Sequence, residues 1–388
     1  MQRLPVARLR SGMIVARPII GASGQMLLFT GTILSEMYIH RLREKGIPSI
    51  YVKGDVPELA VEVADVISDE SRFKATFAVR DLMKDVRTEL AVARRGFVTL
   101  NDARVRKSVN LLVDELLTNR DIAVNLADIR TLDTYTFGHS VQVGVLSILT
   151  GVTMGYDNLR LRDLGIGAIL HDIGVTRVKE EIATKAGPLT PEEMHEMQKH
   201  CEYGFDILRY QPNISILSAH VAYQHHEKHN GEGYPRRLKG DDIHEYARIV
   251  AIAEQYDSLI SDRPWRPAHL PHEAVEIIAG GGNYYFDYRV VKPFLENIAV
   301  YPVGTMVELN DGTRGVVTRV QKGMTLRPAI RLVRYEDGTP IRPPREINLM
   351  DHPTLLVSRV LTDPADVLPP GRAARSAAAG GAAARGPA

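Results

Sequence analysis

The sequence predicts a mainly α-helical protein with a long helical middle part between two small modules, α+β at the N-terminus and β-rich at the C-terminus. Three observations support this. Apolar residues recur at helical spacing through the middle of the chain, and strand-like runs stand both before residue 66 and after residue 298. With 388 residues, 44% of them hydrophobic and 24% charged, the chain is long enough for two or three domains with separate cores.

Residues 1–66 are expected to form the small α+β module. Apolar runs at 13–20 and 26–29 flank a glycine-containing turn, which predicts two short strands. Ser35 then stands before a helical stretch that a glycine closes, and the run 50–52 predicts a third strand.

The middle of the chain is expected to be helical throughout, as a connector over 67–132 and a domain over 133–297. In this domain one helix over about 135–150 would carry His139. A second helix, beginning near residue 161, would end near His171-Asp172, because a glycine follows shortly afterwards.

The next helix has a clear start at Thr190. This residue can act as N-cap, a proline follows at the first helical position, and Glu193 completes a capping box. His200 is expected in the middle of this helix. Its neighbour Cys201 is expected to point away from it and to pack in the core.

Residues 298–362 are expected to form the small β-rich module. Alternating residues on either side of Asp311-Gly312 predict a hairpin, and strand-like runs follow at 329–333 and 354–357. The final segment, 363–388, consists largely of Ala, Gly, Pro and Arg and is expected to be disordered.

Charge and composition exclude several classes of function. The formal net charge is +1, from 48 basic and 47 acidic residues, so neither a nucleic-acid-binding surface nor a membrane-binding patch is predicted. The single Cys201 excludes an internal disulfide, in keeping with a reducing compartment. No apolar run approaches about 18 residues, and the N-terminus lacks a secretory signal, so a cytoplasmic protein without a membrane span is expected.

A set of potential metal ligands distinguishes the helical domain. It consists of His139, His171, Asp172, His200, His225 and His226. A lone His-Asp dipeptide is weak evidence for a site, because a histidine at a helix end is commonly structural. The complete set is stronger, since neutral imidazoles with a shared carboxylate can hold two transition metals against a phosphate ester.

These residues resemble the HD-GYP phosphodiesterases, which belong to the HD superfamily of metal-dependent phosphohydrolases and act on the bacterial second messenger cyclic di-GMP. The resemblance covers roughly 165 residues. It includes His171-Asp172-Ile173-Gly174 and the run Gly233-Tyr234-Pro235, and it runs through the segments 135–140, 171–174, 225–235, 247–253 and 261–266. It implies an all-helical HD-type domain over 133–297.

The resemblance also implies a ligand set for two divalent ions, expected to be iron or manganese. His139, His171, Asp172 and Glu254 would surround one ion. A second ion would be held by His200, His225 and His226, with Asp172 bridging both. His171 and Asp172 would be the catalytic pair. A hydroxide bridging the ions would cleave cyclic di-GMP to linear pGpG and, by a second cleavage, to GMP.

Further positions bear on substrate binding and metal number. By resemblance Tyr234 shapes the substrate pocket, and Arg263 and Arg266 contact substrate phosphate, a role that suits the guanidinium fork. Some members of the family bind a third metal through a glutamate at the place of Tyr135, so two metals are expected here. A homodimer is a further expectation.

The chain departs from the family pattern at positions close to the expected chemistry. Val175 stands where a lysine usually contacts substrate phosphate, and Glu254 stands where the last ligand is usually aspartate. Asn230 and Arg237 replace a common Asp and Gly in the pocket loop. Two alternatives therefore stay open: a slow or inactive module that binds cyclic dinucleotides for signalling, or an HD-type phosphohydrolase acting on another nucleotide.

Overall fold

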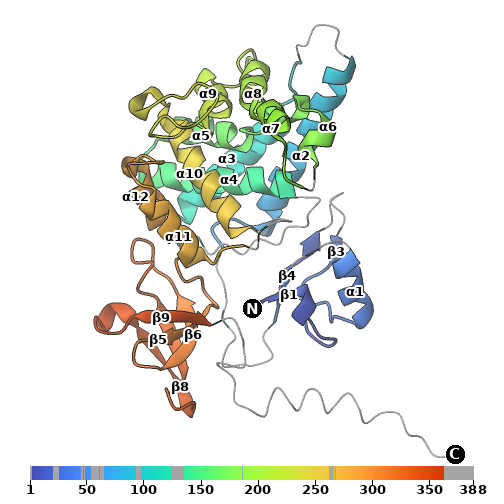
Figure 1. Cartoon of the computed structure of the whole chain (residues 1–388). Coiled ribbons are helices and arrows are strands. Elements are labelled where there is room, and N and C mark those ends of the chain that lie inside the picture. The colour runs from blue at the N-terminus through green and yellow to red at the C-terminus, as the bar shows by residue number, and fades with distance from the viewer. Residues whose placement is uncertain are drawn as a thin grey trace, which may run out of the picture.

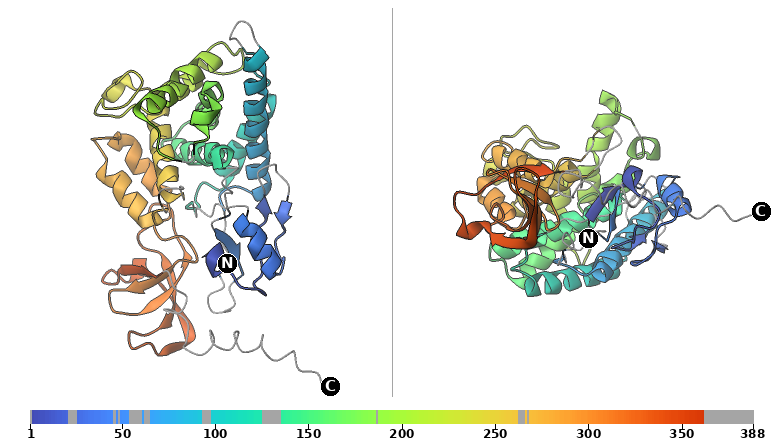
Figure 2. Two further views of the ribbon diagram at one scale, coloured as in Figure 1. Left: turned by 45° about the vertical axis from the view of Figure 1, so that its right-hand side comes forward. Right: turned by 90° about the horizontal axis from the view of Figure 1, so that it is seen from below.

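A computed structural model describes most of this chain. The described residues are 2–20, 26–44, 47, 49–53, 61, 65–92, 98–124, 135–185, 187–261, 266 and 268–361. A body of helices carries two small modules at one end, the N-terminal module and the C-terminal sheet (Figures 1 and 2). The prediction of a mainly α-helical protein with two small flanking modules is confirmed.

The helical body extends from residue 69 to residue 296. Its α-helices are α2 Asp69–Val92, α3 Ala103–Thr118, α4 Tyr135–Thr153, α5 Asn158–Ile169, α6 Glu180–Ala183, α7 Pro191–Gln198, α8 His200–Leu208, α9 Ile216–Gln224, α10 Glu245–Ile260, α11 Pro271–Gly280 and α12 Tyr288–Glu296. Among the described residues, no helix is both long and apolar enough to cross a membrane.

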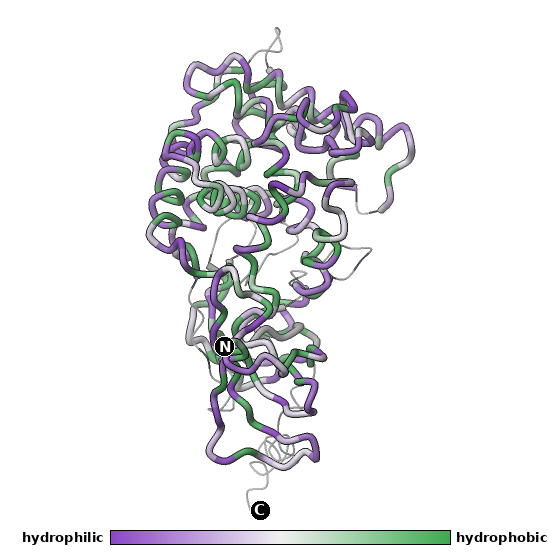
Figure 3. Tube along the Cα trace, turned by 90° about the vertical axis from the view of Figure 1, so that its left-hand side faces the viewer, coloured by the Kyte–Doolittle hydropathy of each residue, from purple (hydrophilic) through white to green (hydrophobic). Residues whose placement is uncertain are grey.

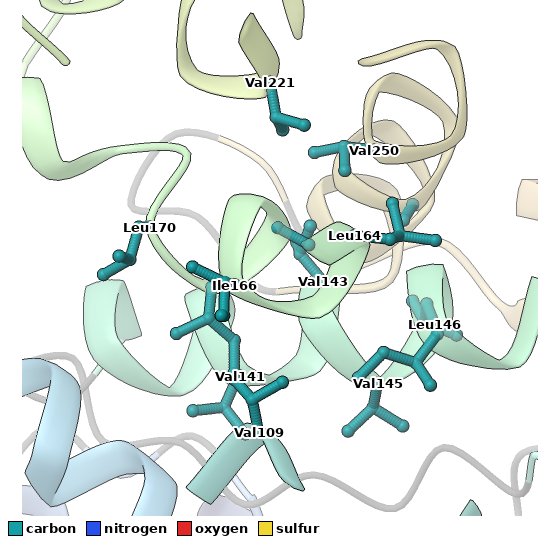
Figure 4. Close-up of a cluster of buried hydrophobic side chains, with 14 of the residues drawn as sticks. Val109, Val141, Val143, Val145, Leu146, Leu164, Ile166, Leu170, Val221 and Val250 are labelled. Atoms are coloured by element: carbon teal, nitrogen blue, oxygen red, sulfur yellow. The ribbon is translucent and has the colours of Figure 1, made fainter. Parts of the chain in front are cut away.

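Helix α4 is the centre of this body and contacts α2, α5, α10 and α12. It contains no charged residue, so it can be buried on nearly all sides. Figure 4 shows its valines among apolar side chains from α3, α5, α9 and α10. Each fully buried aliphatic side chain contributes about 1.5–3 kcal/mol, so this core fixes the helix that carries His139.

The expected connector is not separate from the domain in its packing. Val79 of α2 and Leu112 of α3 belong to the same apolar core as Leu146 of α4 and Leu164 of α5. Apolar stretches run through the inside of the helical body, whereas polar stretches lie mostly along its outside (Figure 3). The helices before residue 118 therefore help to position α4 and α5.

One expected helix is divided in two. Thr190 and Glu193 form the predicted capping box at the start of α7, but α7 ends at Gln198. After Lys199 a new helix, α8, begins at His200. His200 consequently lies in the first turn of α8 instead of the middle of a helix, and this prediction was wrong.

The N-terminal module pairs β1 (Gln2–Pro5) with β4 (Ser49–Val52) and β2 (Ile19–Ile20) with β3 (Met26–Leu28), and α1 (Glu36–Glu44) packs beside them. The strand β1 had no counterpart in the sequence prediction.

A chain of polar contacts joins this module to the helical body. Arg17 donates hydrogen bonds to Asp65 at 3.2 Å, and Arg72 of α2 donates to the same carboxylate at 3.3 Å. Arg72 also donates to the side-chain oxygen of Gln142 at 2.7 Å. Gln142 lies on α4, one turn after His139.

The C-terminal module is a five-stranded antiparallel sheet in the order β8-β7-β6-β5-β9. Its strands are β5 Met306–Leu309, β6 Arg314–Arg319, β7 Ala329–Arg334, β8 Pro340–Asn348 and β9 Val357–Leu361. The predicted hairpin is confirmed, since β5 pairs with β6 and Gly312 takes a positive φ of 79° in the turn. The expected disordered segment 363–388 lies outside the described residues.

Candidate metal centre

His139 is held from behind by a carboxylate. Its Nδ1 lies 2.6 Å from Oδ2 of Asp257 on α10, and both side chains are buried. Because the ionised carboxylate can only accept, Nδ1 carries the proton that it donates, and Nε2 remains free of a proton as a potential ligand atom. The helices α4 and α10 thus fix one end of the cluster.

Three further imidazoles are oriented by backbone carbonyls. The Nδ1 atoms of His171, His200 and His225 lie 2.7, 2.7 and 3.0 Å from the carbonyl oxygens of residues 168, 197 and 222. Each Nδ1 therefore donates to the preceding turn of its own chain segment. In each ring Nε2 is left as the potential ligand atom.

These rings meet around the carboxylate of Asp172. Its Oδ2 lies 3.4 Å from Nε2 of His171. Its Oδ1 lies 3.5 Å from Nε2 of His200 and 3.7 Å from Nε2 of His225, and those two nitrogens are 3.2 Å apart. A single carboxylate thus stands between both halves of the histidine set.

Three overlapping groups of side chains could hold a metal ion, judged from the spacing of their ligand atoms. The groups are His139, His171 and Asp172; His171, His225 and Glu254; and His200, Cys201 and His225. His226 lies beside them, with its Nε2 3.7 Å from Oε1 of Glu254. The structure therefore brings together all seven residues that the sequence analysis expected to bind metal.

The donors fit divalent transition metals by an independent observation. Nε2 of His171 is buried and makes no hydrogen bond among the described residues. A buried imidazole nitrogen without a hydrogen bond is costly, and a metal ion bound by it and the nearby Asp172 carboxylate would satisfy it. Imidazole and carboxylate groups together are the usual ligands of iron, manganese and zinc.

Burial sets the protonation of most of the cluster. It lowers the pKa of His200, and it lowers the pKa of His225 well below the ordinary histidine value with help from the neighbouring imidazoles. Burial also opposes protonation of His171, but the Asp172 carboxylate outweighs it and raises the pKa of His171 to about 9. His200 and His225 are thus neutral near pH 7, as metal ligation requires, whereas His171 would have to lose a proton when a metal binds.

A glycine sets the distance between two ligand segments. Gly174 lies two residues after Asp172 in the short helix η4 (Ile173–Arg177). A Cβ on Gly174 would lie 1.9 Å from the carbonyl oxygen of His200 and 2.5 Å from the backbone nitrogen of Gly204. The backbone therefore packs directly on α8, and this contact brings Asp172 close to His200.

The loop after His226 is folded back on itself. The buried carboxylate of Glu227 accepts hydrogen bonds from the backbone N–H groups of Arg236 and Leu238 at 2.8 and 2.9 Å. A Cβ on Gly233 would meet the backbone nitrogen of Lys228 at 2.4 Å, so no side chain fits there. The ring of Tyr234 consequently stacks on His226, with ring centroids 4.6 Å apart.

Neither of the two arginines expected to contact substrate phosphate is seen pointing at the cluster. Arg266 donates to the carbonyl oxygen of Ser258 at 2.7 Å, and Arg263 lies outside the described residues.

Two positions that depart from the family pattern lie near the site. Val175 is half-buried in η4. Arg237 takes a positive φ of 55°, a conformation that costs a non-glycine residue about 1–2 kcal/mol, which explains why glycine is common there.

Two side chains near the cluster were missed or misplaced by the sequence analysis. Asp257 was not among the expected ligands, but it holds His139 in position. Cys201 was expected to point away from His200, whereas its Sγ lies 3.5 Å from Nε2 of His200. The break before α8 places His200 and Cys201 together in the first turn of a new helix, and periodicity within one continuous helix could not reveal that.

Two sequence patterns match this chain. Residues 132–290 match the HD domain family, and residues 306–366 match a KOW domain associated with HD domains.

Similar proteins match over different shares of the chain. The Pseudomonas aeruginosa protein named cyclic di-GMP phosphodiesterase PA4108 is 30% identical over 352 residues, which cover 86% of this chain and 85% of that protein. A Vibrio cholerae protein named 3'3'-cGAMP-specific phosphodiesterase 2 is 31% identical over 193 residues, covering 49% of this chain and 37% of that protein. The solved structure of Bd1817, an HDG"Y"P protein from Bdellovibrio bacteriovorus, aligns with a TM-score of 0.46 and 17% identity, covering 75% of this chain and 97% of that chain.

Proposed function

Because this chain belongs to the HD-GYP family of the HD superfamily of metal-dependent phosphohydrolases, we propose that it hydrolyses cyclic di-GMP to linear pGpG and, by a second cleavage, to GMP. The observation that carries the proposal is the convergence of four Nδ1-anchored imidazoles on Asp172. Such a centre is built to hold cations against a phosphodiester.

We assign the ligands to two divalent ions, iron or manganese. His139, His171, Asp172 and Glu254 hold the first ion. His200, His225 and His226 hold the second, and Asp172 is shared between them. The assignment is supported by the position of Asp172, whose two oxygens lie 3.4 to 3.7 Å from three different imidazole nitrogens.

When bound, the two ions would polarise the phosphate and lower the pKa of a nearby water, so that hydroxide is supplied near neutral pH. The chain's own residues prepare the site for this chemistry. His200 and His225 stay neutral because they are buried, and Asp172 stays ionised among the imidazoles because they lower its pKa despite burial. We assign His171 and Asp172 as the catalytic pair.

Tyr234 borders the substrate side of the site. Its ring covers one face of His226 and is held there by the folded loop that Glu227 fastens. We assign phosphate contacts to Arg263 and Arg266. Among the described residues Arg266 hydrogen-bonds through one guanidinium nitrogen, to Ser258, and its fork carries further donors that could reach a ligand oxygen.

A second candidate function is a binding module that senses the dinucleotide with slow or no turnover. Val175 favours it, because the chain lacks a cationic side chain directly after the His-Asp-Ile-Gly run. A third candidate is hydrolysis of another cyclic dinucleotide, which the similarity to a protein named for 3'3'-cGAMP favours.

One experiment separates the three candidates. The full chain is purified without oxygen, loaded with iron or manganese, and incubated with cyclic di-GMP or 3'3'-cGAMP, and products are followed by chromatography. The main proposal predicts pGpG from cyclic di-GMP. Intact cyclic di-GMP with measurable binding would favour the sensor, and turnover of 3'3'-cGAMP alone would favour the third candidate.

We further propose that the enzyme acts in the cytoplasm as a homodimer. The proposed substrate is a bacterial second messenger, so we expect the enzyme to meet it in the cytoplasm. Sedimentation of the purified chain measures the oligomeric state directly, and a purely monomeric species at micromolar concentration would contradict the dimer.

A further inference from the structure

We propose that Cys201 is a further ligand of the ion assigned to His200, His225 and His226, so that this half of the centre contains a sulfur atom beside its imidazoles and the shared Asp172. The inference rests on the metal-dependent function proposed above. It adds a sulfur ligand that the expected ligand set lacks.

The spacing of the donor atoms matches one coordination sphere. In a tetrahedral site with metal–nitrogen bonds of about 2.0 Å and a metal–sulfur bond of about 2.3 Å, two nitrogens lie about 3.3 Å apart, and a nitrogen lies about 3.5 Å from the sulfur. Here the Nε2 atoms of His200 and His225 are 3.2 Å apart, and Sγ of Cys201 is 3.5 Å from Nε2 of His200. Both separations are those of a metal's ligands.

Asp172 would be a further ligand of this ion. Its Oδ1 lies 3.5 Å from Nε2 of His200 and 3.7 Å from Nε2 of His225, slightly wider than the spacing of donor atoms around one ion. Nε2 of the buried His171, which makes no hydrogen bond among the described residues, lies 3.4 Å from the other oxygen of this carboxylate, Oδ2. The carboxylate therefore links the sulfur-containing half of the centre to the other half.

The local fold explains why adjacent residues reach the same point. His200 and Cys201 begin α8 directly after the interruption at Lys199, and both are buried. The Nδ1 of His200 donates a hydrogen bond to the carbonyl oxygen of Met197, and its Nε2 consequently faces Cys201. On binding, the S–H bond of Cys201 breaks, its proton leaves to solvent, and the sulfur electron pair bonds to the ion.

A buried cysteine is more often a small packing residue than a metal ligand. The two roles predict different effects when Cys201 is replaced. A packing residue changes stability when replaced but leaves metal preference alone. A thiolate ligand favours zinc, cobalt or ferrous iron over manganese, because manganese prefers oxygen ligands. Of the two ions expected for this chain, the sulfur therefore selects iron.

The test compares the full chain with the variants Cys201→Ser and Cys201→Ala after metal removal and titration with cobalt(II), zinc or manganese. The unmodified chain should show a near-ultraviolet thiolate-to-cobalt absorption, and both variants should lose it. Affinity for cobalt and zinc, measured by competition with a chelator, should fall by at least about tenfold, whereas manganese affinity changes little.

Ser147→Ala is the matched control. Ser147 is a fully buried residue of α4, two turns beyond His139, and its replacement also removes one small polar atom from the interior. This variant should retain the cobalt absorption and the zinc preference. Thermal unfolding of the metal-free proteins shows whether each variant is folded.

The possible failures can be told apart. Two bound ions without a thiolate absorption, or identical metal preference in Cys201→Ser, would overturn the cysteine ligand and leave the phosphodiesterase proposal standing. Absence of any bound ion in the unmodified chain would overturn both.

Discussion

The two ends of the histidine cluster are anchored by different groups. At the His139 end, the ring is held by the side-chain carboxylate of Asp257. At the α8–α9 end, defined by His200 and His225, the rings are held by backbone carbonyls of their own segments. Both anchors fix the same tautomer, but the first brings a negative charge, whereas the second is part of the helix itself. A single substitution can remove only the first.

The electrostatics of the two ends differ accordingly. Burial lowers the pKa of His139, but the hydrogen bond and charge of Asp257 oppose it. At His225 burial and the surrounding imidazoles act in the same direction, and the pKa falls well below the ordinary histidine value. The His139 end therefore offers a more basic ligand, and the α8–α9 end offers one that stays neutral over a wider pH range.

The largest expected effect comes from removing the group that both ends share. Asp172→Ala should lose both ions and lower turnover by about 10³-fold or more, since the charge stabilisation of the transition state disappears. His139→Ala should lose only one ion. Elemental analysis gives the metal content, and Asp206→Asn on the exposed side of α8 serves as control. Unchanged metal content in Asp172→Ala would contradict the shared carboxylate.

Gly174→Ala should separate the two ends by forcing η4 away from α8. The added Cβ would meet backbone atoms of His200 and Gly204, which cannot move aside as a side chain can. We expect a loss of about 3 kcal/mol in the free energy of unfolding, measured by denaturant titration of the metal-free protein. Gly187→Ala, whose Cβ would meet no atom within 4 Å, should have little effect.

Asp257→Asn should weaken only the His139 end. The amide keeps the shape of the carboxylate but not its charge, so we expect about 10- to 100-fold weaker binding of one ion, and unchanged binding of the other. Stepwise competition with a chelator separates the two ions. Equal weakening of both would show that the two ends do not act as separate sites.

Val175→Lys should have the smallest effect and should leave both ends intact. A cation next to the His-Asp-Ile-Gly run would add a contact to substrate phosphate worth about 1 kcal/mol, because the position is partly exposed. The ratio kcat/KM for cyclic di-GMP should rise about fivefold, with metal content unchanged. A matched Val175→Met variant, which lengthens the side chain without charge, should show no rise.

Features that depend on neighbouring residues were predicted correctly from the sequence, whereas contacts between distant residues were not. The capping box at Thr190 and the hairpin at Asp311-Gly312 depend on neighbouring residues, and both are confirmed. The contact between His139 and Asp257 joins residues 118 positions apart, so spacing could not predict it. The direction of Cys201 depends on a helix break at Lys199 that no proline or glycine marks.

The assignment of Asp172 as the shared ligand remains a prediction from resemblance. The side chains of all seven expected ligands lie close together in the structure.

The polar chain from Arg17 to Gln142 has a consequence for how this protein can be cut into parts. A fragment starting at residue 67 would keep every histidine of the cluster, yet it would lose Asp65, the acid that faces the guanidinium of Arg72. That guanidinium is largely shielded from water and also donates to Gln142, one turn from His139. The guanidinium of Arg72 would then lie beside the central helix α4 without its carboxylate partner. The excised domain should therefore be less stable than its intact apolar core implies.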